Sequence, residues 1–372
     1  MKRKICFVSL GSLPLLILDE SLKYAGGAEL KQVLIGRELV KRGYIISFIV
    51  YNEKNEEHIK NFDEIIIVKS FSPSQNFSLF KKARMLWKSL KEANSDIYIQ
   101  ATNPPGIVAL YCFVKRKKYI KWLSSNKSVH LQDVTQRTKL ITKISLYFDI
   151  KLANLIIVQN GFQKEIIERR FRKKCVLIKN PTTILDNSID LKKKKGKNLI
   201  LWVGTIRSIK QPELFLDIAK MLPQYRFIMI GGASNSELEL YSKIEKETRS
   251  ISNLDFLGFI PHNKIHKYYL QSSIFVNTSI AEGFPNTFLE SWVNYIPVAS
   301  LNVDPDEVIC INKLGFHSRS FEQLVEDVDT LLKNDNLREE MATNAMQYVK
   351  SEHDIKKITD EFVKIFEDPS LR

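Results

Sequence analysis

Short apolar runs and amphipathic segments alternate along almost the whole chain, and this order limits the fold more than any other feature. An apolar run bounded by turn residues indicates a buried strand, and a longer segment with apolar residues three and four apart indicates a helix. We expect strands at Ile5–Leu10, Ile45–Tyr51, Ile65–Val68, Ile97–Gln100, Leu155–Gln159, Leu199–Val203, Arg226–Ile230 and Leu254–Leu257, and helices at Ala28–Arg42, Glu213–Met221 and Ser236–Thr248. The alternation predicts an α/β protein with parallel sheets.

A charged run, LKKKKGK at residues 191–197, interrupts the alternation, and we interpret it as a linker. A chain of 372 residues is long for a single hydrophobic core. We therefore predict two domains, 1–188 and 189–352, with a ligand site in the cleft between them. The stretch 321–367 is predicted to form three helices.

Basic residues are concentrated in the first half of the chain. Residues 1–186 hold 33 lysines and arginines against 16 acidic residues, whereas residues 187–372 hold 23 against 26. The asymmetry predicts an anionic partner for the first half, either a nucleic acid or a membrane surface with acidic lipids. A solvated, lysine-rich surface explains any single cluster, such as KRKK at 115–118, but not the difference between the halves.

Several classes of protein are not indicated by the sequence. No apolar run approaches the roughly 18 residues of a membrane-spanning helix. The four cysteines are scattered without a C-x-x-C pair, which fits a reducing cytoplasm. Neither G-x-G-x-x-G nor G-x-x-x-x-G-K-[ST] occurs, so sites for NAD or ATP are not indicated.

Residues 282–290 read EGFPNTFLE and place two carboxylates eight residues apart around a Gly-Phe-Pro turn. The preceding SIFVNTS indicates a buried strand, and the apolar residues after the turn indicate a helix. Pro285 suits the first helical position, and Asn286 suits the first turn. A helix N-terminus favours a phosphate, while Glu282 and Glu290 can accept hydrogen bonds from sugar hydroxyls. The segment therefore predicts a site for a nucleotide sugar.

This pattern resembles the Glu-x7-Glu signature of family 4 of the retaining glycosyltransferases, which have the GT-B fold. The resemblance covers most of the chain and is strongest from residue 199 to 315. It implies two Rossmann-like domains facing across an interdomain cleft, with the acceptor on the first and the nucleotide sugar on the second. It also implies that the last segment, 353–372, forms a helix that packs back on the N-terminal domain.

The resemblance assigns roles within the Gly-Phe-Pro segment. Glu282 would bind the hexose hydroxyls, and Glu290 would bind the ribose hydroxyls. The donor-binding residues implied around them are Gly283, Phe284, Pro285 and Asn286. The sequence departs from the family at Tyr295, where a glycine is common, and this departure predicts an altered local turn.

A pair of cations follows the predicted strand Leu199–Val203. Gly204 permits a tight turn there, and Arg207 and Lys210 come next. Cleavage of a sugar–diphosphate bond leaves negative charge on a phosphate oxygen, which such cations stabilise. The family usually has an arginine directly after the glycine and a lysine five residues later, but Thr205 takes the arginine position here. The resemblance therefore implies Lys210 as a catalytic residue, with Arg207 as the substitute cation.

Two other segments resemble donor-binding parts of the family. Gly26 and Gly27 lie between the first predicted strand and the first long helix, where glycines let backbone N–H groups approach a ligand. By resemblance, this loop lies over the diphosphate and sugar. Phe259 and Ile260 of FLGFIP are candidates for contact with the nucleotide base, although a core position at a strand end is about as good an interpretation.

The acceptor side has only weak candidates. His130 and Asp133 lie in the first half, where the family commonly has an acceptor-side or catalytic histidine. The alternative interpretation is that His130 is a surface histidine without a role in binding or catalysis.

The sequence contains two D-x-D motifs, and other glycosyltransferases hold a divalent ion with that motif. They are Asp304-Pro305-Asp306 and Asp327-Val328-Asp329. We interpret both as structural, because cationic side chains already balance the phosphate charge. Transfer without a metal or a cofactor is the prediction, with the nucleotide sugar as substrate.

Together these features predict a retaining glycosyltransferase that moves a hexose or N-acetylhexosamine from a nucleotide sugar, with a UDP-sugar favoured. The acceptor is expected to be a glycan or lipid-linked glycan of a bacterial surface polysaccharide. The basic half predicts a cytoplasmic protein at the inner face of the cell membrane, on an anionic surface, without a nucleic-acid partner. The alternatives are a nucleotide-sugar epimerase or an inverting transferase on the same fold, or a non-enzymatic basic protein that binds nucleic acid or membrane.

Overall fold

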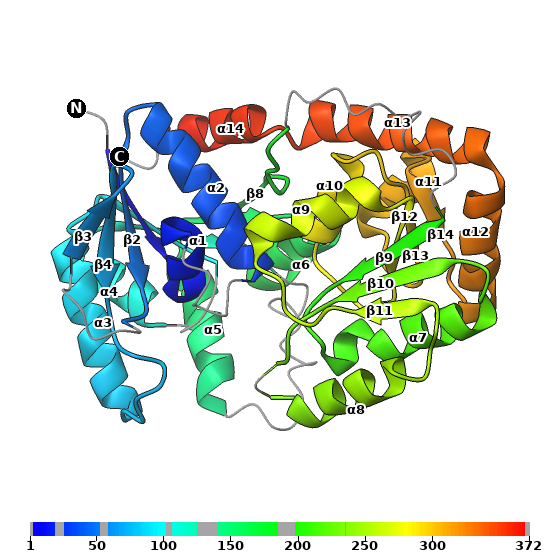
Figure 1. Ribbon diagram of the computed structural model, residues 1–372. Coiled ribbons are helices and arrows are strands. Elements are labelled where there is room, and N and C mark those ends of the chain that lie inside the picture. Colours follow the sequence, from blue (N-terminus) through cyan, green and yellow to red (C-terminus); the bar gives the residue numbers. More distant parts are fainter. Residues whose placement is uncertain are drawn as a thin grey trace. The chain divides into compact units, whose positions relative to one another are not determined.

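The chain forms two compact units in the computed structural model (Figure 1). Unit 1 comprises Met1–Thr183 with Asp354–Arg372, and unit 2 comprises Ile184–His353. The structure describes residues 3–18, 26–52, 59–101, 106–124, 140–184, 198–234 and 236–368. The predicted linker at 191–197 and the predicted boundary at 188/189 lie outside the described residues.

Unit 1 is built on an eight-stranded sheet with the order β3-β4-β2-β1-β5-β6-β7-β8. Neighbouring strands pair in parallel, except β3 with β4, which are antiparallel. The strands are β1 (Lys4–Val8), β2 (Ile45–Val50), β3 (Ile59–Phe62), β4 (Ile65–Lys69), β5 (Ile97–Gln100), β6 (Lys118–Trp122), β7 (Leu155–Val158) and β8 (Cys175–Leu177). A parallel sheet was predicted, and the antiparallel pairing of β3 with β4 departs from that prediction. The strands β3, β6 and β8 were missed.

Strand β6 shows why sequence pattern failed there. Its sequence KYIKW places Lys121 in the buried part of the sheet. The ammonium of Lys121 lies 3.0 Å from Oδ2 of Asp149, which is also buried. A buried charge is tolerated only when such a partner neutralises it, and a partner 28 residues away cannot be recognised by local apolar pattern.

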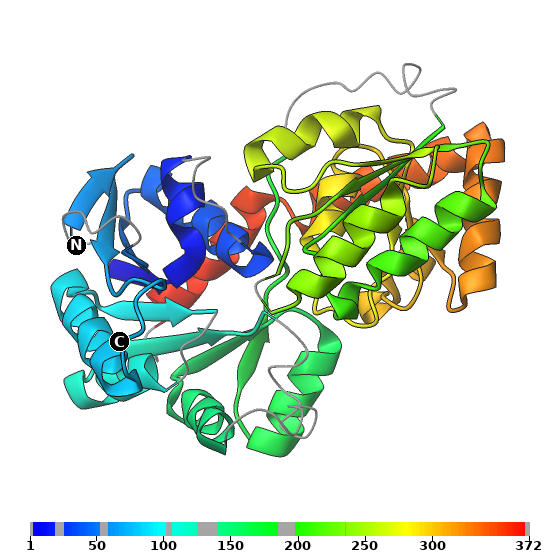
Figure 2. The same cartoon turned by 60° about the horizontal axis from the view of Figure 1, so that its bottom comes forward.

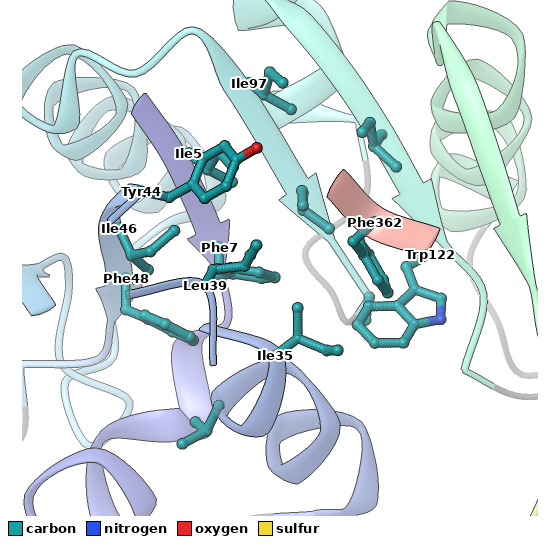
Figure 3. Close-up of a cluster of buried hydrophobic side chains, with 14 of the residues drawn as sticks. Ile5, Phe7, Ile35, Leu39, Tyr44, Ile46, Phe48, Ile97, Trp122 and Phe362 are labelled. Atoms are coloured by element: carbon teal, nitrogen blue, oxygen red, sulfur yellow. The ribbon is translucent and has the colours of Figure 1, made fainter. Parts of the chain in front are cut away.

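Helices cover both faces of the unit 1 sheet (Figure 2). Helices α2 and α14 supply the core on one face, and α3 to α6 supply the core on the other. The helices are η1 (Leu10–Ser12), α1 (Leu13–Ile17), α2 (Gly27–Lys41), α3 (Leu79–Ala93), α4 (Ile107–Lys115), α5 (Leu140–Leu152), α6 (Gly161–Phe171) and α14 (Ile355–Glu367). Figure 3 shows the first of these cores, where Phe7 stacks on Phe48 at a ring distance of 4.9 Å.

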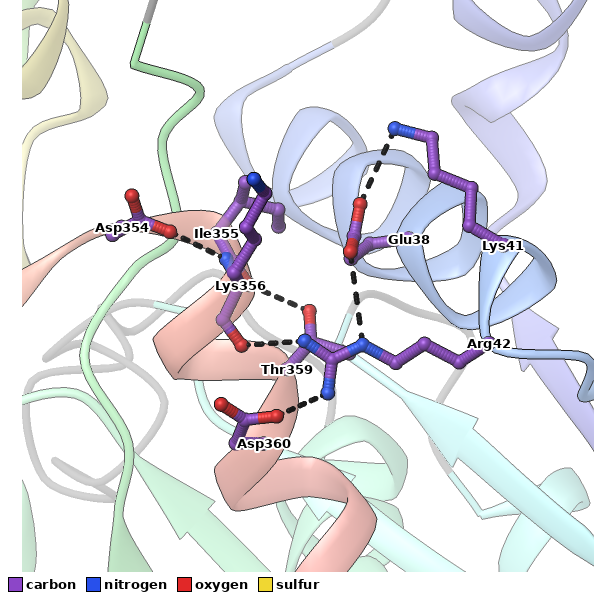
Figure 4. A network of polar contacts seen from close by, with 8 residues as sticks. All are labelled: Glu38, Lys41, Arg42, Asp354, Ile355, Lys356, Thr359 and Asp360. Atoms are coloured by element: carbon purple, nitrogen blue, oxygen red, sulfur yellow. Dashed lines mark hydrogen bonds and ion pairs between the residues drawn. The ribbon is translucent and has the colours of Figure 1, made fainter.

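Helix α14 belongs to unit 1 although it ends the chain. Phe362 on this helix packs against Trp122 of β6, with ring centroids 5.0 Å apart (Figure 3). On its polar side, Arg42 forms an ion pair with Asp360 and donates to the carbonyl of Lys356 at 2.7 Å (Figure 4). The backbone N–H of Ile355 donates to Thr182 O at 3.0 Å. The last helix therefore packs on the first sheet.

Unit 2 is built on a six-stranded parallel sheet with the order β11-β10-β9-β12-β13-β14. Its strands are β9 (Leu199–Val203), β10 (Arg226–Ile230), β11 (Leu254–Phe256), β12 (Ile274–Asn277), β13 (Val298–Ser300) and β14 (Gly315–His317). Its helices are η4 (Ser208–Lys210), α7 (Pro212–Met221), α8 (Leu238–Thr248), α9 (His262–Gln271), α10 (Asn286–Trp292), η5 (Pro305–Glu307), α11 (Val308–Asn312), α12 (Phe321–Lys333) and α13 (Asp335–Glu352). Two parallel-sheet units confirm the predicted α/β class.

Element boundaries differ slightly from the predictions. Pro285 is the N-cap of α10 rather than its first residue, with ψ of 124° that keeps it extended. Helix α8 begins at Leu238, two residues after the predicted start at Ser236. Among the described residues, no helix is long and apolar enough to cross a membrane.

Candidate functional site

The candidate site lies where the strand order of unit 2 reverses. From β9 the chain proceeds to β10 and β11 on one side, whereas β12, β13 and β14 lie on the other. In open parallel sheets, ligands bind beyond the carboxyl ends of the strands at such a switch point. The loops after β9 and β12 are therefore the expected position for a ligand.

Hydrogen bonds join these two loops directly. Thr278 donates through Oγ1 to Lys210 O at 2.7 Å, and Trp202 Nε1 donates to Thr278 Oγ1 at 3.0 Å. The backbone N–H of Ile280 donates to Ile209 O at 2.9 Å. These bonds fix the backbone that carries Lys210 against the segment that leads to Glu282.

Lys210 and Glu282 meet between the two loops. Lys210 Nζ forms a hydrogen-bonded ion pair with Glu282 Oε1, and Ser279 Oγ donates to the same oxygen at 3.1 Å. Both charged side chains are partly buried, with exposed fractions of 24% and 19%. Both therefore remain accessible to a ligand.

Arg207 points to a different carboxylate. Its Nε lies 3.9 Å from Oε1 of Glu237, and its side chain is half exposed. The backbone N–H of Ser208 donates to Oε2 of Glu237 at 2.6 Å. Arg207 and Lys210 thus follow the same strand, but the structure does not bring them to a common partner.

Glu290 on α10 is held by two side chains from α9. Nε2 of His262 donates to Oε1 of Glu290 at 3.0 Å, and the hydroxyl of Tyr269 donates to Oε2 at 2.8 Å. His262 and Tyr269 lie seven residues apart, and this spacing of two turns places them on one side of α9. Neither residue was predicted from the sequence, although His262 directly follows the FLGFIP segment.

The carboxylate of Glu290 changes the acidity of both partners. Burial alone lowers the pKa of His262, but the hydrogen bond and the charge of Glu290 outweigh it, so the pKa is raised above its ordinary value. Burial is the main cause that raises the pKa of Tyr269 well above its ordinary value, and the charge of Glu290 adds to it. Tyr269 therefore stays a neutral donor to this carboxylate.

Glycines shape the strand ends beside the two loops. A Cβ on Gly231 would lie 2.2 Å from the carbonyl oxygen of Gly204, so the two backbones approach too closely for a side chain there. Gly258 has φ of +63°, which a side chain would disfavour. Phe259 follows it with its ring over Gly232 and is 44% exposed, so the aromatic face next to this strand end is accessible.

The other residues of the predicted donor segment differ in their exposure to solvent. The ring of Phe284 is buried and lies 4.9 Å from the ring of His353, so only its backbone can face a ligand. Gly283 and Pro285 are also buried, whereas Asn286 is partly exposed at the start of α10. Ile260 packs partly against the unit 2 core.

The predicted residues of unit 1 are described only in part. Gly26 is the N-cap of α2, and its backbone N–H donates to Oε2 of Glu29 at 3.1 Å. Gly27 is the first residue of that helix. His130 and Asp133 lie outside the described residues.

The D-x-D carboxylates make internal hydrogen bonds. Asp304 accepts the backbone N–H groups of Ile309 at 2.8 Å and Cys310 at 3.2 Å. Asp327 accepts the hydroxyl of Ser318 at 2.6 Å. Asp329 accepts the hydroxyl of Tyr225 at 2.7 Å. Asp304, Asp327 and Asp329 therefore have structural roles at turns and helix surfaces.

In the described part of the chain, one group of side chains could hold a metal ion, namely Asp304, Cys310 and His317. The carboxylate already accepts two backbone donors, and Nδ1 of His317 lies 3.9 Å away from it. Burial is the main cause that raises the pKa of the Cys310 thiol, and the hydrogen bond to Asp304 adds to it. The two backbone donors give Asp304 a structural role at the turn before α11.

Residues 184–348 match the family model described as glycosyl transferases group 1. The matched stretch spans nearly all of unit 2. Unit 2 is therefore similar to the group 1 glycosyl transferases over almost its whole length. The predicted resemblance to glycosyltransferases is thereby confirmed at the level of this family.

Two curated relatives extend the similarity to almost the whole chain. An uncharacterized glycosyltransferase of Haemophilus influenzae is 24% identical over 91% of this chain and 95% of its own length. The Campylobacter jejuni GalNAc-α-(1→4)-GalNAc-α-(1→3)-diNAcBac-PP-undecaprenol α-1,4-N-acetyl-D-galactosaminyltransferase is 24% identical over 92% of this chain and 95% of its own.

Solved structures share the fold of this chain. Sucrose-phosphate synthase of Thermosynechococcus elongatus matches with a TM-score of 0.80 and 14% identity, covering 98% of both chains. Anabaena HepE, solved with UDP and glucose, matches with a TM-score of 0.74 and 16% identity, covering 98% of this chain and 99% of its own. The predicted GT-B architecture is confirmed by these likenesses.

Proposed function

We propose that the protein is a retaining, metal-independent glycosyltransferase of family 4, which transfers a hexose or N-acetylhexosamine from a nucleotide sugar. The observation that carries the proposal is the pairing of Lys210 with Glu282 at the switch point of the unit 2 sheet, with Glu290 fixed on the following helix. A cation for a diphosphate and two carboxylates for hydroxyls are what a nucleotide sugar requires.

Lys210 is the residue that stabilises the leaving group. As the bond from the sugar carbon to the diphosphate oxygen breaks, the electron pair stays on that oxygen, and the ammonium of Lys210 offsets the charge. The acceptor hydroxyl attacks on the same face and passes its proton to the departing diphosphate. Arg207 is the second cation in this proposal, and its long side chain would have to leave Glu237 to reach the phosphates.

The two carboxylates hold opposite ends of the donor. Glu282 accepts hydroxyls of the hexose, beside the backbone of Gly283 and Phe284, while it stays within reach of Lys210. Glu290 accepts the ribose hydroxyls and keeps its orientation through Tyr269 and His262. Both carboxylates use fixed partners of the protein, so little rearrangement is needed when the donor binds.

UDP-sugars are the favoured donors. HepE, which shares the fold, is solved with UDP and glucose, and the Campylobacter relative is named as a transferase of N-acetylgalactosamine. Phe259 offers an exposed ring beside the β10 and β11 ends on which a base could stack. No metal and no cofactor take part in the proposed reaction.

The proposed acceptor is a glycan or lipid-linked glycan of a bacterial surface polysaccharide. The name of the Campylobacter relative includes a PP-undecaprenol acceptor. The basic excess of residues 1–186 would favour an anionic membrane over nucleic acid as the partner. We therefore propose a cytoplasmic enzyme, peripheral on the inner face of the cell membrane, with the acceptor on unit 1.

The test is to incubate the protein with UDP-sugars and an acceptor extract and to determine the anomeric configuration of the product by NMR. An α-linked product from an α-linked donor supports retention. A β-linked product would favour an inverting transferase, and a changed sugar without an acceptor would favour an epimerase. Activity that EDTA abolishes and Mn²⁺ restores would contradict metal-independent transfer.

A further inference from the structure

The outer surface of helices α3, α4 and α5 in unit 1 exposes large apolar side chains. Phe80 at the start of α3 is 80% exposed, and Phe113 on α4 is 67% exposed. Among the side chains of these three helices that the structure describes, the other large apolar ones that are exposed are Leu79, Leu110, Val114, Ile144, Tyr147 and Phe148. Where such side chains gather on neighbouring helices, they are expected at a site of interaction with a protein or a membrane.

The spacing shows that two of the helices carry an outward apolar stripe. On α4 the stripe is Leu110, Phe113 and Val114, with intervals of three and one residues. On α5 the stripe Ile144, Tyr147 and Phe148 repeats the same intervals. Residues with this spacing lie on one side of a helix. Both helices are therefore apolar toward solvent in addition to the sides that they bury.

The stripes lie in one layer of unit 1. Helix α4 packs against α3 on one side and against α5 on the other. All three cover the same face of the sheet, where their inner residues share one core. In Figure 2 these helices, in cyan and blue-green, lie on the opposite side of the sheet from α2 and α14, in blue and red. We call the outward surface of α3, α4 and α5 the helix layer.

The charges of the helix layer are nearly all positive. Its exposed cations include Lys81, Arg84, Lys88 and Lys91 on α3, Lys115 on α4, Arg116 directly after it, and Lys151 on α5. The two acids of these helices are already paired. Glu92 lies 3.5 Å from Lys88, and Asp149 is buried against Lys121. The cations thus flank apolar stripes without an opposing exposed charge among the described residues of these helices.

We propose that the helix layer docks on an anionic lipid bilayer, with the aromatic and aliphatic stripes in the interface and the cations on the headgroups. Amphipathic surfaces that join aromatic and aliphatic residues to lysine and arginine bind in this way. Each basic residue near such a surface adds to the attraction.

Two other occupants fit the helix layer less well. A nucleic acid would use the cations and could stack on aromatic rings, but it has no partner for Leu110, Val114 and Ile144. A second copy of the chain would bring like charges together, which opposes association. The bilayer uses both the apolar and the basic residues.

The inference rests on the proposed function for the acceptor's location, because a lipid-linked acceptor lies where the helix layer would dock. The docking itself requires neither donor nor acceptor. It is therefore measured on the full chain by cosedimentation with vesicles of phosphatidylcholine alone and of phosphatidylcholine with phosphatidylglycerol.

Phe113→Ser/Val114→Ser tests the apolar stripe. We expect at least a tenfold loss of binding to phosphatidylglycerol vesicles, because burial of an apolar side chain contributes about this much or more. The matched control is Ile311→Ser, which removes an equally exposed apolar side chain from unit 2 and should bind like wild type.

Lys115→Glu/Arg116→Glu tests the charges, with Lys246→Glu/Lys350→Glu in unit 2 as the control of equal charge change. We expect at least a fivefold loss for the first pair, with the wild type itself released by high salt. Unchanged circular dichroism and melting temperature would show that the variants are folded.

The proposal is overturned if the wild type ignores phosphatidylglycerol vesicles, or if the unit 1 variants and their controls bind equally. It is also overturned if the same variants lose binding to duplex DNA or lose a dimer while vesicle binding persists. A failure of the proposed function gives another result: the protein would bind phosphatidylglycerol vesicles but would not be stabilised by any nucleotide.

Discussion

Tyr269 and Glu290 are joined by a hydrogen bond of 2.8 Å, although they lie on helices that flank β12 on either side in the chain. Tyr269 is buried, whereas Glu290 is only partly buried. The tyrosine therefore acts as a fixed donor that orients a more accessible carboxylate. The proposed ribose contact depends on this orientation.

Tyr269→Phe removes only the hydroxyl group. We expect the free energy of unfolding to fall by about 1.5 to 3 kcal/mol, because the lost bond goes to a carboxylate. We also expect weaker binding of the nucleotide, measured by calorimetry. The control is Tyr268→Phe on the same helix, which should change stability by less than about 0.5 kcal/mol. Equal effects of the two variants would contradict the orienting role.

The pairing of His262 with Glu290 predicts a dependence of stability on pH. Because the pKa of His262 is raised in the folded protein, its contribution is fully present below the unfolded pKa and is lost as the pH rises through the folded pKa. The difference in melting temperature between wild type and His262→Gln should therefore be larger at pH 5.5 than at pH 9.

The same comparison in a Glu290→Gln background separates this pair from other histidines. There, His262→Gln should give no difference that depends on pH, because the carboxylate that favours the imidazolium is gone. A difference that persists would assign the effect to another group.

Tyr295 has φ of +56°, a left-handed backbone that disfavours residues with a side chain. The family's common glycine at this position is therefore explained by conformation. We expect Tyr295→Gly to be more stable than Tyr295→Ala by about 1 kcal/mol in urea denaturation. The opposite order is expected at Lys350 within α13, where alanine should exceed glycine by about 1 kcal/mol. Equal stability at Tyr295 would contradict the left-handed conformation.

Lys210 and Arg207 should differ in catalysis. Lys210→Ala is expected to lower kcat by about a hundredfold to a thousandfold, because a cation at the leaving group is lost. Arg207→Ala should lower kcat by about tenfold or less, because the guanidinium of Arg207 lies beside Glu237 in the structure. Steady-state kinetics with a UDP-sugar measures both. A larger loss for Arg207→Ala would make Arg207 the main phosphate cation.

The local pattern of apolar residues and turns predicted several of the unit 2 elements around the candidate site. The strands β9 and β10 were predicted with the bounds that the structure shows, and the turn before α10 was predicted within one residue. These elements are regular because apolar runs and a Gly-Phe-Pro turn specify them locally. Lys210 follows β9 and Glu282 follows β12. Because these two strands are adjacent and parallel, the loops after them lie side by side.

The contacts that local pattern missed come from distant segments. His262 and Tyr269 reach Glu290 from a helix whose own sequence shows only an ordinary amphipathic surface. The direction of Arg207 depends on Glu237, 30 residues later in the chain. Such pairings require the tertiary fold, so residue spacing alone does not reveal them.

The most direct test of the central claim is thermal stability with UDP, GDP and ADP for the wild type, Glu290→Ala and Ile311→Ser. At about 100 times its dissociation constant, a bound nucleotide adds about 2.7 kcal/mol of stability. We predict that UDP stabilises the wild type and Ile311→Ser, and that Glu290→Ala loses this response while remaining folded. A wild type that responds to none of the three nucleotides, or a Glu290→Ala variant that responds as strongly as wild type, would contradict the proposed donor site.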